Sequence, residues 1–158
     1  MATLIFRYGE EPASRRIARA IVNARPIRST RHLADTIERT LPRQRSIHPA
    51  TRTFQALRIT INHELDGIQE VLPMTLQILA SGGRLAIISF HSLEDRLVKE
   101  FFRQESRDCL CPPKQPVCTC GHKATIHEVN RHPIIPSTEE VSVNKRSRSA
   151  KLRIAEKR

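Results

Sequence analysis

The chain has 158 residues with 4% aromatic content and no tryptophan, which is enough for one domain or one and a fraction. Its 27 basic and 16 acidic residues give a formal net charge of +11, which favours a polyanionic partner, although a soluble basic surface would also explain it. No run of about 18 apolar residues occurs, which excludes a membrane span, and the first residues lack a signal-peptide pattern. A cytoplasmic location is therefore expected.

Arginine dominates the first third of the chain. Residues 7–58 contain twelve arginines and no lysine, and the planar guanidinium suits phosphate recognition better than an ammonium does. A second basic segment, 144–158, contains seven basic residues and one acid.

The front of the chain is predicted to be helical. Residues 1–8 form the end of a helix stopped by Gly9, and residues 12–24 form a second helix. Ser29 or Thr30 can cap a third helix that stops before Pro42, and a basic loop follows at 42–48. The apolar positions predicted to face the core are Ala13, Ile17, Ile21, Ala24, Leu33, Ala34, Ile37 and Leu41.

A long helix is predicted to begin at Pro49, and Pro73 is predicted to start a short new helix that runs to Leu79. The three- and four-residue steps of the long helix predict a buried face made of Phe54, Leu57, Ile61, Leu65, Ile68 and Leu72. After a glycine turn, the apolar run 85–89 shows no alternation. It predicts a strand buried on both faces, as in a mostly parallel sheet.

The next helix is predicted to begin with a capping box made by Ser92 and Asp95. Its buried side is predicted to contain Leu93, Leu97, Val98, Phe101 and Phe102. A cysteine- and proline-rich loop follows at 106–121, then a strand at 124–130, an irregular connection at 133–149 and a half-exposed closing strand at 150–156.

The segment Ser89–Ser92 is the first candidate site, because α/β proteins bind ligands at the carboxyl ends of their strands. His91 can exchange protons near neutral pH, and two hydroxyls flank it. The alternative is that Ser92 only caps the helix and His91 is an ordinary loop residue. The absence of a Gly-x-Ser-x-Gly elbow argues against a hydrolase triad.

The helix start at 48–58 is a second candidate, since free backbone N–H groups and nearby arginines can hold phosphate. An ordinary solvated helix start is the alternative, and it is favoured on the residues alone.

The four cysteines form a third candidate, because four thiolates within twelve residues can close a tetrahedral structural zinc site. Reduced thiols and local disulfides are the alternatives. The cysteines are Cys109, Cys111, Cys118 and Cys120. No Gly-x-Gly-x-x-Gly or Walker motif is present, so the sequence shows no obvious binding motif for a nucleotide cofactor.

Several segments together resemble the bacterial 16S rRNA cytosine-N4 methyltransferase family, also called the MraW family. The matching motifs follow the family order and span nearly the whole chain. They are Tyr8–Glu11, Arg16–Val22, His48–Arg58, Gly82–Arg96, the cysteine loop and Asn144–Glu156.

This resemblance implies an α/β fold: the last strands of a Rossmann-like methyltransferase sheet in residues 49–158, preceded by part of an inserted all-helical substrate domain in residues 1–48. It implies S-adenosylmethionine as cofactor and 16S rRNA of the small ribosomal subunit as partner. Ser89 and His91 are the implied catalytic residues. The implied substrate-binding residues are Arg52, Thr53, Gln55, Arg58 and Phe90.

The family's upstream half, which carries the glycine-rich cofactor loop, has no counterpart here. The chain therefore resembles the carboxyl-terminal half of such an enzyme, and we expect it to be inactive alone. A truncated gene, an incomplete gene prediction or an expressed fragment would each explain this. A zinc-stapled RNA-binding module without enzymatic activity and a nonfunctional remnant are the competing hypotheses.

Overall fold

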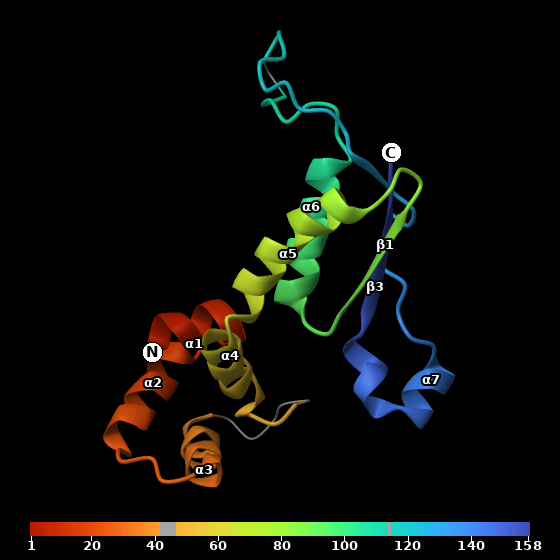
Figure 1. Cartoon of the computed structure of the whole chain (residues 1–158). Helices are drawn as coiled ribbons and strands as arrows, with labels where there is room; N and C mark the ends of the chain where they lie inside the picture. Colours follow the sequence, from red (N-terminus) through yellow and green to blue (C-terminus); the bar gives the residue numbers. More distant parts are fainter. Residues whose placement is uncertain (42–46, 114) are drawn as a thin grey trace. The chain divides into compact units, whose positions relative to one another are not determined.

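The computed structural model describes residues 1–41, 47–113 and 115–158, and it divides into two compact units, Met1–Glu64 and Leu65–Arg158 (Figure 1). The helix that follows residue 48 packs within the first unit, whose last residue is Glu64. Most of the predicted basic loop, residues 42–46, lies outside the described residues. Within the described ranges, no helix has the length and apolarity that crossing a membrane requires.

The first unit contains α1 (Ala2–Gly9), α2 (Ser14–Asn23), α3 (Thr30–Thr40) and α4 (Thr51–Asn62). The first three match the predicted helices, and Ser29 caps α3 by accepting a hydrogen bond from the His32 N–H at 3.1 Å. The buried core of the unit contains Ile5, Ile17, Ala18, Ile21, Ile37, Leu41 and Ala50, which includes four of the predicted inward positions.

Gly9 does not stop α1 as predicted; it is the last residue of the helix, and Glu10 takes the left-handed conformation with φ 49°. The glycine is required for a different reason. A Cβ on Gly9 would lie 2.5 Å from the Arg52 carbonyl oxygen, so only glycine lets α1 approach α4 this closely.

The single long helix predicted from Pro49 is wrong, because the chain breaks at His63, which is left-handed with φ 52°. The residues on either side form α4 and α5 (Glu64–Ile78), and Pro73 lies inside α5 rather than at the start of a new helix. The predicted buried face of α4 is also wrong at Ile61, which is 73% exposed. The buried positions of α4 are Thr53, Ala56 and Ile59.

The second unit contains a three-stranded sheet made of β1 (Arg84–Ser89), β2 (Ile126–Glu128) and β3 (Lys151–Lys157) in the order β1-β3-β2. Both outer strands pair antiparallel with β3, so β1 and β2 run in the same direction. The helix α6 (Ser92–Glu105) lies between them in the chain. The predicted irregular connection contains α7 (Thr138–Val143) and a 3₁₀ turn, Lys145–Ser149, which the sequence pattern did not indicate.

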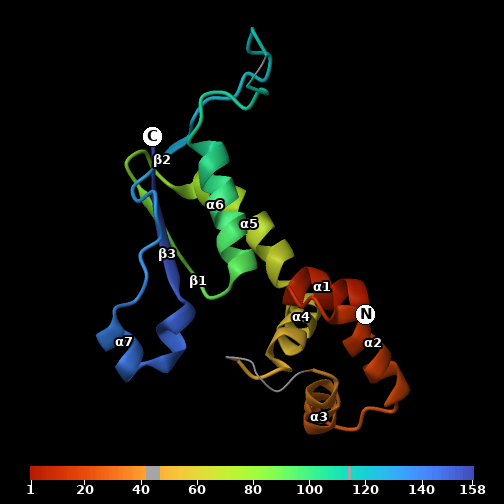
Figure 2. The ribbon, with the colours of Figure 1, turned by 180° about the vertical axis from the view of Figure 1, so that it is seen from behind.

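The core of this unit lies between α6 and one face of the sheet (Figure 2). Val98, Phe102, Ile126 and Ala155 are buried there, and Leu85 and Ile87 of β1 pack against them with side chains of α5. The predicted burial of both faces of β1 is wrong, since Ile88 is 59% exposed. Side chains alternate along a strand, and the described elements cover only the face of Leu85 and Ile87.

A buried ion pair fastens β3 to α6. The Arg153 Nε donates to Asp95 Oδ1 at 2.7 Å, its Nη2 to Asp95 Oδ2 at 3.3 Å, and the Arg153 side chain is only 6% exposed. Lys151 Nζ lies 3.2 Å from the same carboxylate. Burial alone would raise the pKa of Asp95, but the hydrogen bonds and charges of Arg153 and Lys151 outweigh it and hold the pKa below its usual value.

Candidate functional site

The loop Ser89–Phe90–His91 lies where β1 ends and α6 begins, as predicted. His91 is the N-cap: its Nδ1 accepts from the Glu94 N–H at 3.3 Å, and the Glu94 carboxylate accepts from the His91 N–H at 3.2 Å. This reciprocal pair is the capping box, so the predicted box of Ser92 and Asp95 is wrong by one residue. Asp95 instead binds Arg153.

The capping geometry limits what His91 can do chemically. Because Nδ1 accepts a backbone hydrogen bond, the proton of the neutral ring resides on Nε2, which lies 3.3 Å from Glu94 Oε1. Taking up a second proton at Nδ1 would break the cap. The arrangement favours a positioning function for His91 over proton acceptance.

Phe90 is the exposed member of the loop, with 55% of its surface accessible. Its backbone N–H donates to Glu94 Oε2 at 2.8 Å, and the neighbouring Ser89 is buried, with its hydroxyl 3.4 Å from the Lys151 carbonyl oxygen. The Phe90 ring is therefore exposed to solvent, while hydrogen bonds to Glu94 and Lys151 hold the loop that carries it. Such a ring can stack on a nucleobase, which contributes about 1–3 kcal/mol.

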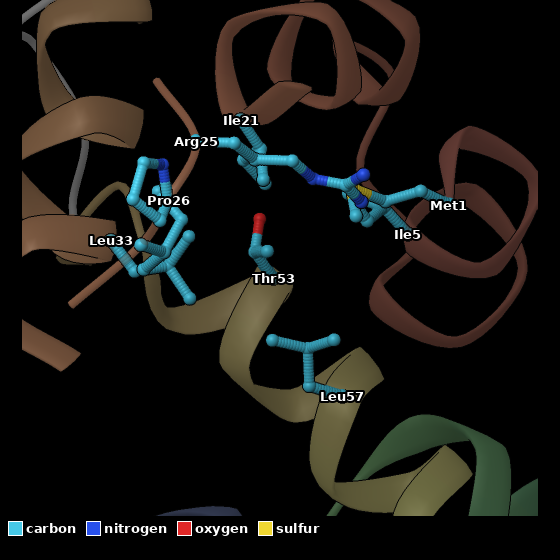
Figure 3. A pocket seen from close by; sticks show the side chains of 9 residues that line it. Met1, Ile5, Ile21, Arg25, Pro26, Leu33, Thr53 and Leu57 are labelled. Atoms are coloured by element: carbon cyan, nitrogen blue, oxygen red, sulfur yellow. The ribbon is translucent and has the colours of Figure 1, made fainter. Parts of the chain in front are cut away.

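The first unit contains an apolar pocket of about 630 Å³ next to Thr53 (Figure 3). Its walls include Ile5, Ile21, Leu33 and Leu57. Thr53 is fully buried, and its hydroxyl has no hydrogen-bond partner among the described residues. Figure 3 shows this hydroxyl pointing into the pocket beneath the Arg25 side chain. Arg25 was not predicted, because nothing distinguishes it within the arginine-rich front of the chain.

The other predicted substrate-binding residues of α4 make contacts inside the first unit. Arg52 donates to the Glu10 carbonyl at 3.2 Å, and Gln55 Nε2 donates to the Tyr8 carbonyl at 3.2 Å. Arg58 forms a two-pronged pair with Glu64 at 2.8 and 3.0 Å. Of the four predicted residues on α4, Thr53 alone lines the pocket.

Two backbone N–H groups at the predicted phosphate site, the start of α4, are already bonded. The Ala50 N–H donates to His48 Nδ1 at 3.2 Å and the Thr51 N–H donates to the His48 carbonyl at 3.0 Å, which agrees better with an ordinary helix start.

The four cysteines meet in the loop at 106–121, as the zinc hypothesis requires. Their sulfur atoms all lie within 4.8 Å of one another, and four of the separations are 3.4, 3.6, 3.8 and 4.0 Å. Four sulfurs at the Zn–S distance of 2.3 Å from a tetrahedral ion would be about 3.8 Å apart. A disulfide needs about 2.05 Å, and all four cysteines are free.

Backbone N–H groups donate to two sulfur atoms of this cluster. The Leu110 N–H lies 3.4 Å from Cys120 Sγ and the Cys111 N–H lies 3.4 Å from Cys109 Sγ. Hydrogen bonds from the N–H groups of Leu110 and His122 lower the pKa of Cys120 to about 6. The Cys111 N–H lowers the pKa of Cys109, but hydrogen bonds with the thiols of Cys118, Cys111 and Cys120 outweigh it and raise that pKa to about 12. The donor set and its spacing fit Zn²⁺.

Comparison with known proteins establishes the family. A sequence model of the MraW methylase family matches residues 1–158, and the chain belongs to this family, as its motifs predicted. Curated relatives named ribosomal RNA small subunit methyltransferase H include that of Dehalococcoides mccartyi, 52% identical over 158 residues, which are 99% of this chain and 45% of the relative.

The relative from Heliobacterium mobile is 54% identical over 160 residues, covering 98% of this chain and 51% of its own length. That from Thermomicrobium roseum is 50% identical over 161 residues, covering 99% and 49%. The chain thus spans about half the length of the curated relatives it matches.

Proposed function

We propose that a protein containing this chain transfers a methyl group from S-adenosylmethionine to the N4 amine of a cytidine in 16S rRNA. The family match and the name shared by the curated relatives support an rRNA methyltransferase. The structural observation that carries the proposal is the exposed ring of Phe90 on a tied loop at the carboxyl end of β1. An enzyme that acts on a base must extrude it and stack it in this way.

The fold proposal is that residues 49–158 form the edge of a Rossmann-like sheet, and that residues 1–48 belong to a helical substrate-binding insertion. Two observations support it. β1 and β2 run in the same direction with α6 between them in the chain, and an antiparallel strand joins them, as in many mixed sheets. The exposed apolar face at Ile88 is available for a further layer.

The residues of this chain are assigned to RNA and base recognition. Phe90 stacks on the cytosine, and Ser89 and His91 hold the loop so that the amine is aligned for transfer, which needs orientation more than a strong base. Thr53 is assigned to substrate binding through the pocket of the first unit, together with Arg52, Gln55 and Arg58 of the same helix.

The described residues do not form a cradle for S-adenosylmethionine. The backbone N–H groups of Phe90 and His91 at the start of α6 are bonded to Glu94, and the pocket beside Thr53 is almost entirely apolar. When bound, the cofactor supplies an electrophilic methyl group. We assign its binding to the half of the relatives that this chain does not cover.

A chimera tests the proposal. Residues 1–158 replace the matched segment of the Dehalococcoides mccartyi relative, and the purified chimera is incubated with radiolabelled S-adenosylmethionine and small ribosomal subunits. We expect label in N4-methylcytidine, identified by mass spectrometry of the digested rRNA. A folded chimera that labels a different atom, or no rRNA nucleoside, would contradict the proposal.

Phe90 is tested in the same chimera. Phe90→Ala should lower kcat/KM by about 5- to 150-fold, which corresponds to the loss of one stacked base. Phe90→Tyr keeps the ring and is the matched control. Equal activity of the two variants would remove Phe90 from the site.

The 158-residue chain alone is expected to show no methyl transfer. Calorimetry with S-adenosylmethionine checks the reason, since micromolar binding to this chain would show that a cofactor cradle exists within it.

We also propose that Cys109, Cys111, Cys118 and Cys120 bind one structural Zn²⁺, because their sulfur separations match a tetrahedral tetrathiolate site. A closed four-sulfur shell leaves no position for a catalytic water. The expected result is one zinc per chain by elemental analysis and a tetrahedral tetrathiolate spectrum after Co²⁺ substitution. Zinc that remains in a Cys118→Ser/Cys120→Ser variant would refute the assignment. The family match gives no support to a stand-alone zinc module or a nonfunctional remnant.

A further inference from the structure

The second unit contains a polar cleft of about 570 Å³ that the proposed methyl-transfer site does not use. One wall comes from α6 and the residues just after it, and the other comes from β2 and the segment that follows. Its charged lining side chains are Lys99, Arg103, Arg107, Glu128, Arg131 and Arg153.

Most of the positive charge in this cleft is not neutralised. Arg153 is paired with Asp95. Within the described ranges, no carboxylate makes an ion pair with Lys99, Arg103, Arg107 or Arg131, and all four residues are exposed. Glu128 is the single carboxylate in the lining. Four unpaired cations around one carboxylate repel one another, and a bound anion relieves that repulsion.

The two walls are held together before any ligand arrives. The Thr125 N–H donates to the Glu105 carbonyl at 2.9 Å, and the Thr125 hydroxyl donates to the Glu105 carboxylate at 2.7 Å. Ile126 of β2 is buried against α6. Lys99 and Arg103 are four residues apart, so they lie on one side of α6. The cations are therefore carried on a preformed scaffold.

A second hollow of about 510 Å³ shares Arg103 and Arg107 with the cleft and is also lined by Glu100, Gln104 and Leu110. A single small anion would need one of these hollows, whereas a polymer with regularly spaced phosphates can occupy both. Guanidinium groups also bind phosphate oxygens in pairs, which a lone ammonium cannot do.

We propose that this cleft binds the phosphodiester backbone of RNA and so holds the substrate at a place separate from the base-stacking loop. The proposal rests on the proposed function, because it takes the polyanion to be the RNA substrate. Phosphate contacts fix the register of a nucleic acid without reading its bases.

The salt dependence of RNA binding by the 158-residue chain tests the proposal. Fluorescence anisotropy of a labelled single-stranded RNA is measured from about 50 to about 200 mM salt, where each phosphate contact contributes about 0.7 to the log–log slope. The double variant Lys99→Gln/Arg103→Gln should lower the slope by about 1.4. Arg84→Gln is the control, since Arg84 is already paired with Glu156 at 2.9 Å.

Glu128→Gln should act in the opposite direction and tighten RNA binding, because it removes the one carboxylate of the lining. This variant keeps the test informative even if the double variant folds poorly, which circular dichroism would detect. A structural function for these side chains would not produce opposite effects for opposite charges.

The proposal is overturned if the wild-type chain does not bind RNA or if the double variant keeps the wild-type slope. It is also overturned if Arg84→Gln lowers the slope as much as the double variant does. Polyglutamate that binds as tightly as RNA at equal charge would assign the cleft to an acidic polypeptide and also overturn it. If the chimera methylates rRNA while the slopes do not change, the cleft fails and the proposed function stands. If the slopes change as expected while the folded chimera does not methylate rRNA, the cleft binds RNA and the proposed function fails.

Discussion

Asp95 gives the sharpest test of how the second unit is held together. Asp95→Asn keeps the size of the side chain but removes the charge that compensates Arg153, whose side chain is 6% exposed and bonded through two nitrogens. Breaking a buried pair by removing one partner costs about 3–5 kcal/mol. Because a domain is stabilised by about 5–15 kcal/mol, the variant should lose a large part of its stability.

The assay is hydrogen exchange of the β3 amides under native conditions together with urea unfolding followed by circular dichroism, since the chain has no tryptophan. Asp108→Asn is the matched control. Asp108 is 79% exposed and lies 3.7 Å from Arg158, so its loss should cost at most about 1 kcal/mol. The double variant Asp95→Leu/Arg153→Met should recover much of the loss, because it removes both charges.

The pH dependence follows from the direction of the pKa shift. The pKa of Asp95 lies below 3.8 in the folded chain, so the unfolded chain binds the proton more readily. The stabilisation is fully present above that value and is lost as the pH falls through the folded-state pKa. The difference between wild type and Asp95→Asn should therefore shrink in acid. A loss below about 1 kcal/mol, or one equal to that of Asp108→Asn, would refute the reasoning.

Four further outcomes are expected. Gly9→Ala should destabilise the first unit by about 1–3 kcal/mol because its Cβ would meet the Arg52 carbonyl, whereas Gly67→Ala, with open space, should be neutral or stabilising; urea unfolding compares them. His91→Ala should cost about 1 kcal/mol through the lost cap and His91→Asn much less, and equal costs would argue against capping. His91→Ala with unchanged turnover in the chimera would remove His91 from the mechanism. Thr53→Val should raise stability by about 1 kcal/mol by removing an unpaired buried hydroxyl, yet raise KM in the chimera if that hydroxyl serves the substrate. Zinc removal with a chelator should change the loop at 106–121 but leave the β3 amides protected, because hydrogen bonds of Thr125 close the base of that loop independently of the cysteines.

Local features of the chain could be predicted from the sequence because neighbouring residues determine them. The cap of α3 at Ser29 follows from the preference of a hydroxyl for free helix N–H groups, and the buried side of α6 follows from apolar spacing. The proximity of the four sulfurs was predicted from cysteines close together in the chain, and the family was predicted from motifs in a fixed order.

The tertiary structure decided features that depend on partners distant in sequence. Ile61 fits a helical apolar stripe, yet it is exposed, because α1 packs against another face of α4. His63 ends that helix in a left-handed conformation, and no glycine or proline at this position predicts the helix end. The apolar run of β1 predicts two covered faces, but burial depends on which elements pack there, and the described elements cover one.

Some candidate sites could be predicted from the sequence, and others are formed only by tertiary packing. The sequence by itself determined the family, the polar loop after β1 and the cysteine cluster, because each is a short segment whose chemistry is local. The basic cleft brings together Lys99 and Arg131, which are far apart in the chain, and the shift of the capping box from Ser92 to His91 released Asp95 to bind Arg153. Only packing selects such partners, because the energy of a contact depends on distance in space and not on separation along the chain.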